Sequence, residues 1–240
     1  MDRHTRKELK TDKFAQGVGS GFEFVAHHRG QMMRWSLIGL AVVAVIAGAW
    51  LYRSHQATAR AELLTKAMQI DEATIGPPQP PRLTFPTFEE KEKARIAAFT
   101  KVATTYPGSQ EGAIAQLAVA AAQGDEGKID DAVKTFQAVS DSAPAPYASV
   151  AQLSMAQIYA SQGKTADAEK LLRKLIDKPT VFVSKEQATL ELAQLLAKSN
   201  PAEARKLLAP LSASPRSAVS RAAVAVLGSI QSAPARAESN

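Results

Sequence analysis

The chain has 240 residues, a formal net charge of +6, 45% hydrophobic residues and no cysteine. The missing thiols exclude disulfide bonds, a thiolate nucleophile and cysteine-ligated metal, while the length allows a substantial buried core. The positive charge is divided between a basic leader and helical segments that carry both signs. This pattern indicates a solvated surface rather than a nucleic-acid site.

The first element in chain order is an uncharged apolar run over residues 35–52. As a helix it would rise about 27 Å, close to the thickness of the hydrocarbon core of a bilayer. We predict an uncleaved transmembrane anchor over these residues. Arginine and aromatic residues mark its two expected interfaces with water: Arg34, Trp35, Trp50, Tyr52 and Arg53.

Two other interpretations of this run are a buried core helix and a cleaved signal peptide. Burial would have to remove every side of an uncharged helix from water. Residues 47–49, Ala-Gly-Ala, fit a small-x-small cleavage site. Against cleavage, the leader is long and the apolar run continues through Trp50 and Leu51. Whether the chain is cleaved after Ala49 stays open.

The leader, residues 1–34, carries seven Lys and Arg against four Asp and Glu. The positive-inside rule places such a short basic segment in the cytoplasm and the following domain on the other side of the membrane. We expect the leader to be a flexible tail, with a membrane-surface helix as the alternative.

Residues 53–86 are predicted to hold a membrane-proximal helix and then a proline-rich loop. Apolar residues at three- and four-residue spacing over 56–72 predict a helix that continues the anchor outward. The sequence Gly-Pro-Pro-Gln-Pro-Pro over 76–81 ends this helix, because proline removes a donor and clashes with the preceding turn. We expect a stiff loop here, and a ligand for a proline-recognising domain is the alternative.

Helix-start signals follow along the rest of the chain. Two are capping boxes and two are caps followed by proline: Thr87 with Glu90, Ser184 with Gln187, Asn200 with Pro201, and Ser214 with Pro215. No segment after the anchor alternates convincingly with a period of two. The predicted fold class is therefore all-α.

One pattern occurs three times, at steps of 36 residues: an alanine is followed by larger residues four and seven positions later. Alanine lets two antiparallel helices approach closely, and the larger residues fill the space between helix pairs. Tyr159 and Gly163 lie in a preceding helix and its turn. The repeated positions are Ala132, Phe136 and Val139, then Ala168, Leu172 and Leu175, then Ala204, Leu208 and Leu211. Three turn residues are expected to take unusual dihedral angles: Gly127, Gly163 and Asn200. Three prolines are expected to end the second helices: Pro144, Pro179 and Pro215.

These residues resemble the tetratricopeptide repeat (TPR), whose helix pairs stack into a superhelix because one pair cannot bury its own face. The resemblance implies a TPR-like α-solenoid over residues 87–231, with 216–230 as its capping helix. Residues 232–240 are expected to be a disordered tail.

The order of segments resembles that of the bacterial YfgM-type ancillary subunits of the SecYEG translocon. Ser54, His55 and Gln56, directly after the aromatic end of the anchor, add a short local match. The long leader and the proline-rich insertion depart from the pattern. The resemblance implies a single-pass protein of the bacterial inner membrane with a periplasmic domain. Its implied partners are the translocon, periplasmic chaperones or secretory chains. The alternative is an accessory subunit of a cell-division, cell-wall or outer-membrane assembly complex.

No catalytic constellation is apparent, so we expect no enzyme activity, cofactor, metal, small-molecule substrate or nucleic acid. The four histidines, His4, His27, His28 and His55, all precede the repeats. This excludes a Ser-His-Asp arrangement within the repeats. Metal binding by the adjacent His27 and His28 is a minor alternative.

Binding is then the remaining role, and in such solenoids the first helices line the concave groove. The expected groove is partly apolar and suits a helix or an extended segment. The alternative is that these residues only pack helix against helix. They are Leu117, Ala121, Val150, Leu153, Gln157, Leu190 and Gln194. Ala44 and Gly48 would also let a second transmembrane helix approach, and the oligomeric state stays open.

Overall fold

The computed structural model describes residues 29–78 and 80–232, so residues 1–28 of the predicted leader and residues 233–240 of the predicted tail lie outside the described residues. The last part of the predicted leader, residues 29–34, is helical rather than a flexible tail. The chain divides into two compact units, which meet between Ala59 and Arg60. The described helices are α2 (Arg29–Asp71), α3 (Phe88–Thr105), α4 (Gln110–Asp125), α5 (Ile129–Ser142), α6 (Ala145–Ser161), α7 (Thr165–Asp177), α8 (Lys185–Leu196), α9 (Pro201–Ser212) and α10 (Ser217–Ser232). The all-α prediction is confirmed, with two minimal strands, β1 (Thr74–Ile75) and β2 (Thr84–Phe85), added.

In the first unit, α2 exposes its apolar side chains on all sides. The exposed large hydrophobic side chains between Met33 and Leu51 each have more than half of their surface accessible to solvent. Among residues 29–78 and 80–232, nothing buries any of the most apolar stretch. The core-helix interpretation is therefore wrong, because a core helix would be covered by other elements. The helix is long and apolar enough to cross a membrane.

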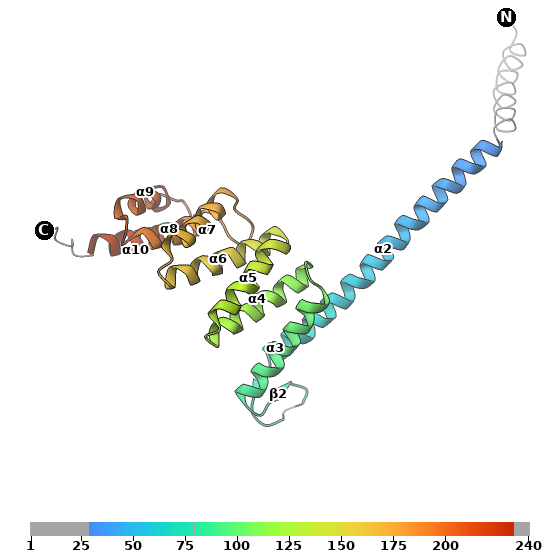
Figure 1. Cartoon of the computed structure of the whole chain (residues 1–240), viewed down its shortest axis with the longest axis horizontal. Coiled ribbons are helices and arrows are strands. Elements are labelled where there is room, and N and C mark those ends of the chain that lie inside the picture. The colour runs from blue at the N-terminus through green and yellow to red at the C-terminus, as the bar shows by residue number, and fades with distance from the viewer. Residues whose placement is uncertain (1–28, 79, 233–240) are drawn as a thin grey trace, which may run out of the picture. The chain divides into compact units, whose positions relative to one another are not determined.

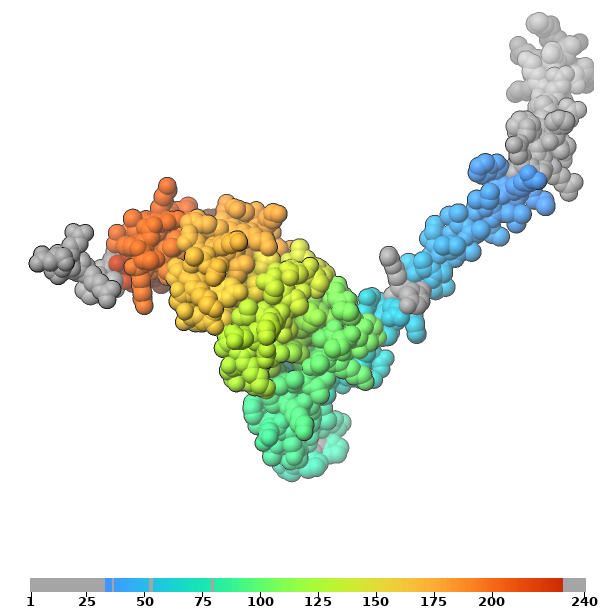
Figure 2. All heavy atoms as spheres, viewed as in Figure 1, coloured from blue at the N-terminus to red at the C-terminus, as the bar shows by residue number. Residues whose placement is uncertain are grey.

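In the second unit, each helix packs against the next one in the sequence (Figure 1). The space-filling view shows the same order as successive bands of colour from green to red (Figure 2). Short turns join the helices, and so neighbours run antiparallel. The core follows this order in three clusters, the first around Phe99, the second around Phe136 and the third around Leu192. Such a nearest-neighbour arrangement is the solenoid that the repeats predict.

The repeated residues lie on the second helices of the pairs, α5, α7 and α9. Ala132, Ala168 and Ala204 are completely buried, which lets the neighbouring helix backbones approach. The positions four residues later, Phe136, Leu172 and Leu208, are also buried. The last positions are buried in α5 and α7, whereas Leu211 in α9 is half-buried.

The compact repeat unit begins before the predicted boundary at residue 87. The last part of α2 is already in the unit, where Leu64 and Ala67 pack with Phe99 of α3. A salt bridge of 2.6 Å from Arg95 Nε to Asp71 Oδ1 also joins the end of α2 to α3. As predicted, α2 continues from the apolar run without a break, and its end serves as the first helix of the first pair.

The turns between the helices of a pair contain left-handed glycines. Gly127 has φ +76° and Gly163 has φ +74°, a region that glycine adopts at little cost. Asn200 differs from the expectation. Its φ is −142° and it caps α9, accepting a hydrogen bond of 3.2 Å from the amide of Glu203.

The predicted caps hold at three of the four helix starts. Thr87 and Ser184 accept hydrogen bonds from the amides of Glu90 and Gln187, at 3.2 Å and 3.1 Å, and Asn200 does so as described above. Ser214 instead accepts a bond of 3.3 Å from the Arg216 amide, and α10 begins only at Ser217. The expectation that Pro144 ends α5 also needs refinement, since this residue is the N-cap of α6.

The proline-rich stretch lies between β1 and β2, which pair in parallel with Thr74 opposite Thr84 and Ile75 opposite Phe85. The pairing brings the two ends of this loop together. Strands of two residues are too short to show any period in the sequence, which is why they were not predicted.

Candidate functional site

A hollow of about 390 Å³ lies between α6 and α8. Its lining comes from the first helices of two successive pairs, from one leucine of α7 between them, and from the turn after α8. The residues are Ala156, Gln157, Ala160, Leu172, Glu191, Gln194, Leu195 and Lys198. Ala156 and Leu172 are buried and form an apolar floor. Gln157, Gln194 and Lys198 line the hollow with polar side chains, and all three are exposed. The hollow therefore combines an apolar floor with polar side chains that can reach a ligand.

Gln157 and Glu191 connect the two helices across this hollow. The side-chain amide of Gln157 donates a hydrogen bond of 3.2 Å to Glu191 Oε1. Carboxylate and amide groups of this kind can bind the backbone groups of an extended peptide. A ligand entering here would have to satisfy the Glu191 carboxylate as Gln157 now does, because an unpaired carboxylate in a partly dry contact is costly.

The structure brings two of the predicted groove residues, Gln157 and Gln194, to the same hollow. Leu153 is only 8% exposed and belongs to the core. Val150 and Leu190 are half-buried against that core. All three residues take part in packing between the helices.

The two predicted positions on α4 lie apart from this hollow. Leu117 packs against the core cluster around Phe136, while Ala121 is exposed. Neither belongs to the lining of the hollow between α6 and α8. Of the seven predicted residues, Gln157 and Gln194 therefore line this hollow.

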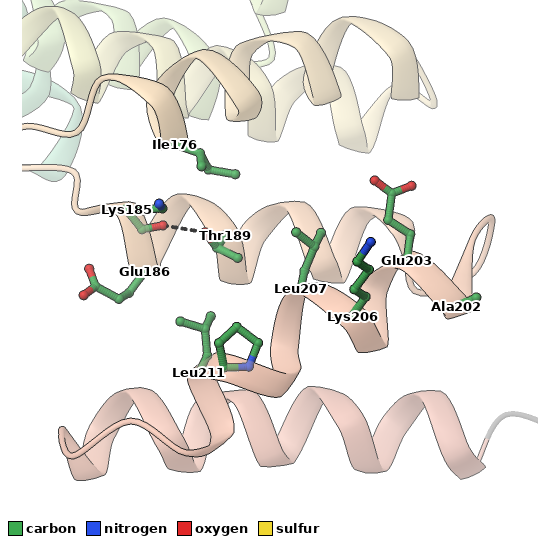
Figure 3. Close-up of a pocket in the computed structure, with 10 residues that line it drawn as sticks. Ile176, Lys185, Glu186, Thr189, Ala202, Glu203, Lys206, Leu207 and Leu211 are labelled. Atoms are coloured by element: carbon green, nitrogen blue, oxygen red, sulfur yellow. Dashed lines mark hydrogen bonds between the residues drawn. The ribbon is translucent and has the colours of Figure 1, made fainter.

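Sequence reasoning missed Glu191 and Lys198, which give the hollow both signs of charge rather than a neutral surface. A signal was present for Glu191, which lies three residues before Gln194 on the same face of α8. Lys198 lies in the turn after α8, where helical spacing gives no signal. It also missed a larger hollow of about 800 Å³ between α7, α8 and α9 (Figure 3). Leu207 and Ile176, which line it, lie one residue away from repeated positions.

Within residues 29–78 and 80–232, no group of three or more His, Asp or Glu side chains is placed to hold a metal ion. His55 is exposed on α2, and the other three histidines lie outside the described residues. Many charged groups are engaged in surface pairs. Arg173, for example, bonds Glu169 and Glu203 at 2.7 Å each, and the hydrogen bonds to Glu203 and Glu169 raise the pKa of Arg173.

The sequence signature of the tetratricopeptide repeat-like domain matches residues 29–178. This chain belongs to the tetratricopeptide repeat-like family. The match covers more than half of the chain and runs from the apolar part of α2 through α7. The α8–α9 pair continues the same arrangement beyond the match. No curated protein matches the chain, and no solved structure does.

Membership in this family supports a role in protein–protein interaction, because TPR-like helical domains are scaffolds that typically have no catalytic activity. The geometry agrees with such a role, since the hollow between α6 and α8 presents side-chain amides and an apolar floor. The apolar helix near the N-terminus is a candidate membrane anchor or signal sequence.

Proposed function

We propose that this protein is a membrane-anchored TPR scaffold of the bacterial inner membrane, with its repeats in the periplasm beside the SecYEG translocon. Its partners are the translocon itself, periplasmic chaperones or secretory chains. The protein binds them through the hollow between α6 and α8, around Gln157, Glu191 and Gln194.

The observation that carries this proposal is the continuity of α2. The helix has an apolar part that is not buried by the described residues, and it runs unbroken into a part that packs with the repeats. An uncleaved helix of this kind would tether the repeats close to a bilayer. The basic leader favours a cytoplasmic N-terminus and hence a periplasmic repeat unit.

The chemistry of the hollow supports a protein segment as its ligand. The apolar floor of Ala156 and Leu172 can take a side chain, and the amides of Gln157 and Gln194 can bond to backbone groups. A segment that emerges unfolded from a translocon offers such backbone groups. The same is true of an exposed helix or strand of a chaperone.

The test is photocrosslinking of the full-length protein in its native membrane. A photoreactive residue replaces Gln157 or Gln194 in turn, and adducts are identified by mass spectrometry. Lys134, on α5 and outside the lining of the hollow, is the matched control position. Leu153 is unsuitable because it is buried in the core.

We expect Gln157 and Gln194 probes to capture translocon subunits, chaperones or secretory chains, and the Lys134 probe to capture few or none of them. Capture of cell-division, cell-wall or outer-membrane assembly proteins instead would contradict the translocon assignment and favour the alternative complex. Equal capture at all three positions would contradict the assignment of the hollow as the binding site.

A further inference from the structure

The larger hollow, between α7, α8 and α9 (Figure 3), is lined by other residues of α8 than the hollow between α6 and α8. At about 3.6 residues per turn, Lys185, Glu186 and Thr189 lie on one face of α8. Glu191, Gln194 and Leu195, which line the other hollow, lie on the opposite face. A ligand can therefore occupy one hollow without touching the other. This inference does not rest on the proposed function.

The walls of this hollow are apolar. Ile176 comes from α7, Thr189 from α8, and Leu207 and Leu211 from α9. Figure 3 shows Leu207 and Leu211 pointing from α9 toward α8. Ile176, Leu207 and Leu211 are half-buried and pack against the core cluster. Since these side chains are already held by the core, the walls are preformed.

The charged groups at the rim are not balanced. Both carboxylates have arginine partners: Glu203 Oε1 lies 2.7 Å from Arg173 Nη2, and Glu186 Oε1 lies 3.4 Å from Arg216 Nη1. In the described part of the chain, Lys185 and Lys206 have no carboxylate within ion-pair distance. The two lysines are thus left to give the rim a positive potential.

The state of Glu186 reinforces this imbalance. Its own backbone amide, then the Ser184 hydroxyl and the charges of Arg216 and, last, Lys185, lower the pKa of Glu186. The carboxylate therefore remains ionised near neutral pH and forms its ion pair with Arg216. Lys185 attracts it only from beyond ion-pair distance, and the ammonium group stays available to a ligand.

The lining extends along α9 from Ala202 to Leu211. At about 1.5 Å per residue this is roughly 14 Å of helix, the length of about four residues of extended peptide. A volume of about 800 Å³ also suits a large apolar side chain together with its neighbours. Both dimensions favour a peptide segment as the occupant.

We infer that this hollow is a second binding site, which takes a protein segment with a large apolar side chain flanked by Asp or Glu residues. The apolar side chain lies against Leu207, Leu211 and Ile176. The acidic residues pair with Lys185 and Lys206, which supply the only unpaired charges among the lining residues.

The test uses the full-length protein in nanodiscs and fluorescently labelled peptides of one length, followed by anisotropy. Three peptides carry a central Leu-Phe flanked by Glu, Gln or Lys, and a fourth carries Ser-Ser flanked by Glu. The double variant Lys185→Glu/Lys206→Glu reverses the rim charge without altering the walls. Lys93→Glu/Lys101→Glu, two exposed positions on α3, changes the net charge equally and is the control.

We expect the Glu-flanked Leu-Phe peptide to bind most tightly. Charge reversal of the two rim lysines should weaken the binding of this peptide at least about fivefold, as loss of two exposed ion pairs predicts. The same variant should bind the Lys-flanked peptide most tightly. The control variant should retain the original preference. Equal effects of the two double variants, or no preference for acidic apolar peptides, would overturn the inference.

Two other occupants are also tested. Tighter peptide binding after removal of residues 233–240 would mean that the chain's own tail occupies the hollow. A dimer that the rim reversal disperses, measured by sedimentation, would identify a second copy instead. Either result would overturn the assignment to a separate partner.

Discussion

Gly112, in the first turn of α4, lies against the backbone carbonyl oxygen of Tyr106, the residue that ends α3. A Cβ atom at this position would overlap the oxygen. The absence of a side chain is thus what allows the chain to pass from the first repeat pair to the second in so tight a turn.

The first prediction is that Gly112→Ala destabilises the repeat unit. Because the methyl group meets backbone rather than a flexible side chain, the turn must move, at a cost of about 1–3 kcal/mol in the free energy of unfolding. Guanidinium unfolding of the detergent-solubilised full chain, followed by circular dichroism, measures it. Gln110→Ala, at an exposed position of the same turn, should change little. Equal stability of the two variants would argue against the tight turn.

The second prediction compares two glycines that both have open space where a Cβ atom would lie. Gly163 has φ +74°, so Gly163→Ala should cost about 1–2 kcal/mol from the left-handed conformation alone. Gly124 lies within α4, where Gly124→Ala should instead stabilise by about 0.5–1 kcal/mol through chain entropy. The same unfolding measurement decides it, and effects of the same sign would contradict the assigned turn conformations.

The third prediction concerns the close approach at the repeated alanines. Ala168 is completely buried, so Ala168→Leu should force neighbouring helices apart and cost about 1–3 kcal/mol or more. Ala166, exposed on the same helix, provides the matched control, and Ala166→Leu should be close to neutral. If both variants unfold at the same guanidinium concentration, the alanine does not set the spacing of the helices.

The fourth prediction is that the surface ion pairs matter less than these packed alanines. Arg173→Ala removes the bonds to Glu169 and Glu203, but the side chain is about half exposed and solvent screens the charges. We expect a loss of less than about 1 kcal/mol. A loss larger than that of Ala168→Leu would show that the ion-pair network, rather than apolar packing, holds α7 against α9.

The repeat architecture could be predicted from the sequence because its cause is local. Alanine with larger residues four and seven positions later produces one buried helix stripe, and the stripe recurs on α5, α7 and α9. The turn glycines 127 and 163 follow from the same regularity. Asn200 was misjudged because asparagine serves both in left-handed turns and as an N-cap, and only the observed φ decides between them.

The candidate sites were harder to predict because they depend on which side of a helix remains uncovered. Leu153 and Gln157 are four residues apart on α6, yet Leu153 is in the core and Gln157 lines a hollow. The hollow beside Leu207 depends on the packing of α7, α8 and α9 together. A single helix pattern carries no information on such a three-helix arrangement.

The most direct test of the central claim, a membrane-anchored scaffold with periplasmic repeats, uses the absence of cysteine from the chain. Thr5→Cys and Lys134→Cys variants are exposed separately to a membrane-impermeant maleimide in spheroplasts, and the intact mass of the membrane-bound protein is measured. We predict that Lys134→Cys is labelled in intact spheroplasts and Thr5→Cys only after lysis. We also predict that the mass of the membrane-bound protein is that of a chain with its leader. Labelling of Thr5→Cys but not Lys134→Cys in intact spheroplasts, or a mass that begins after Ala49, would contradict the account.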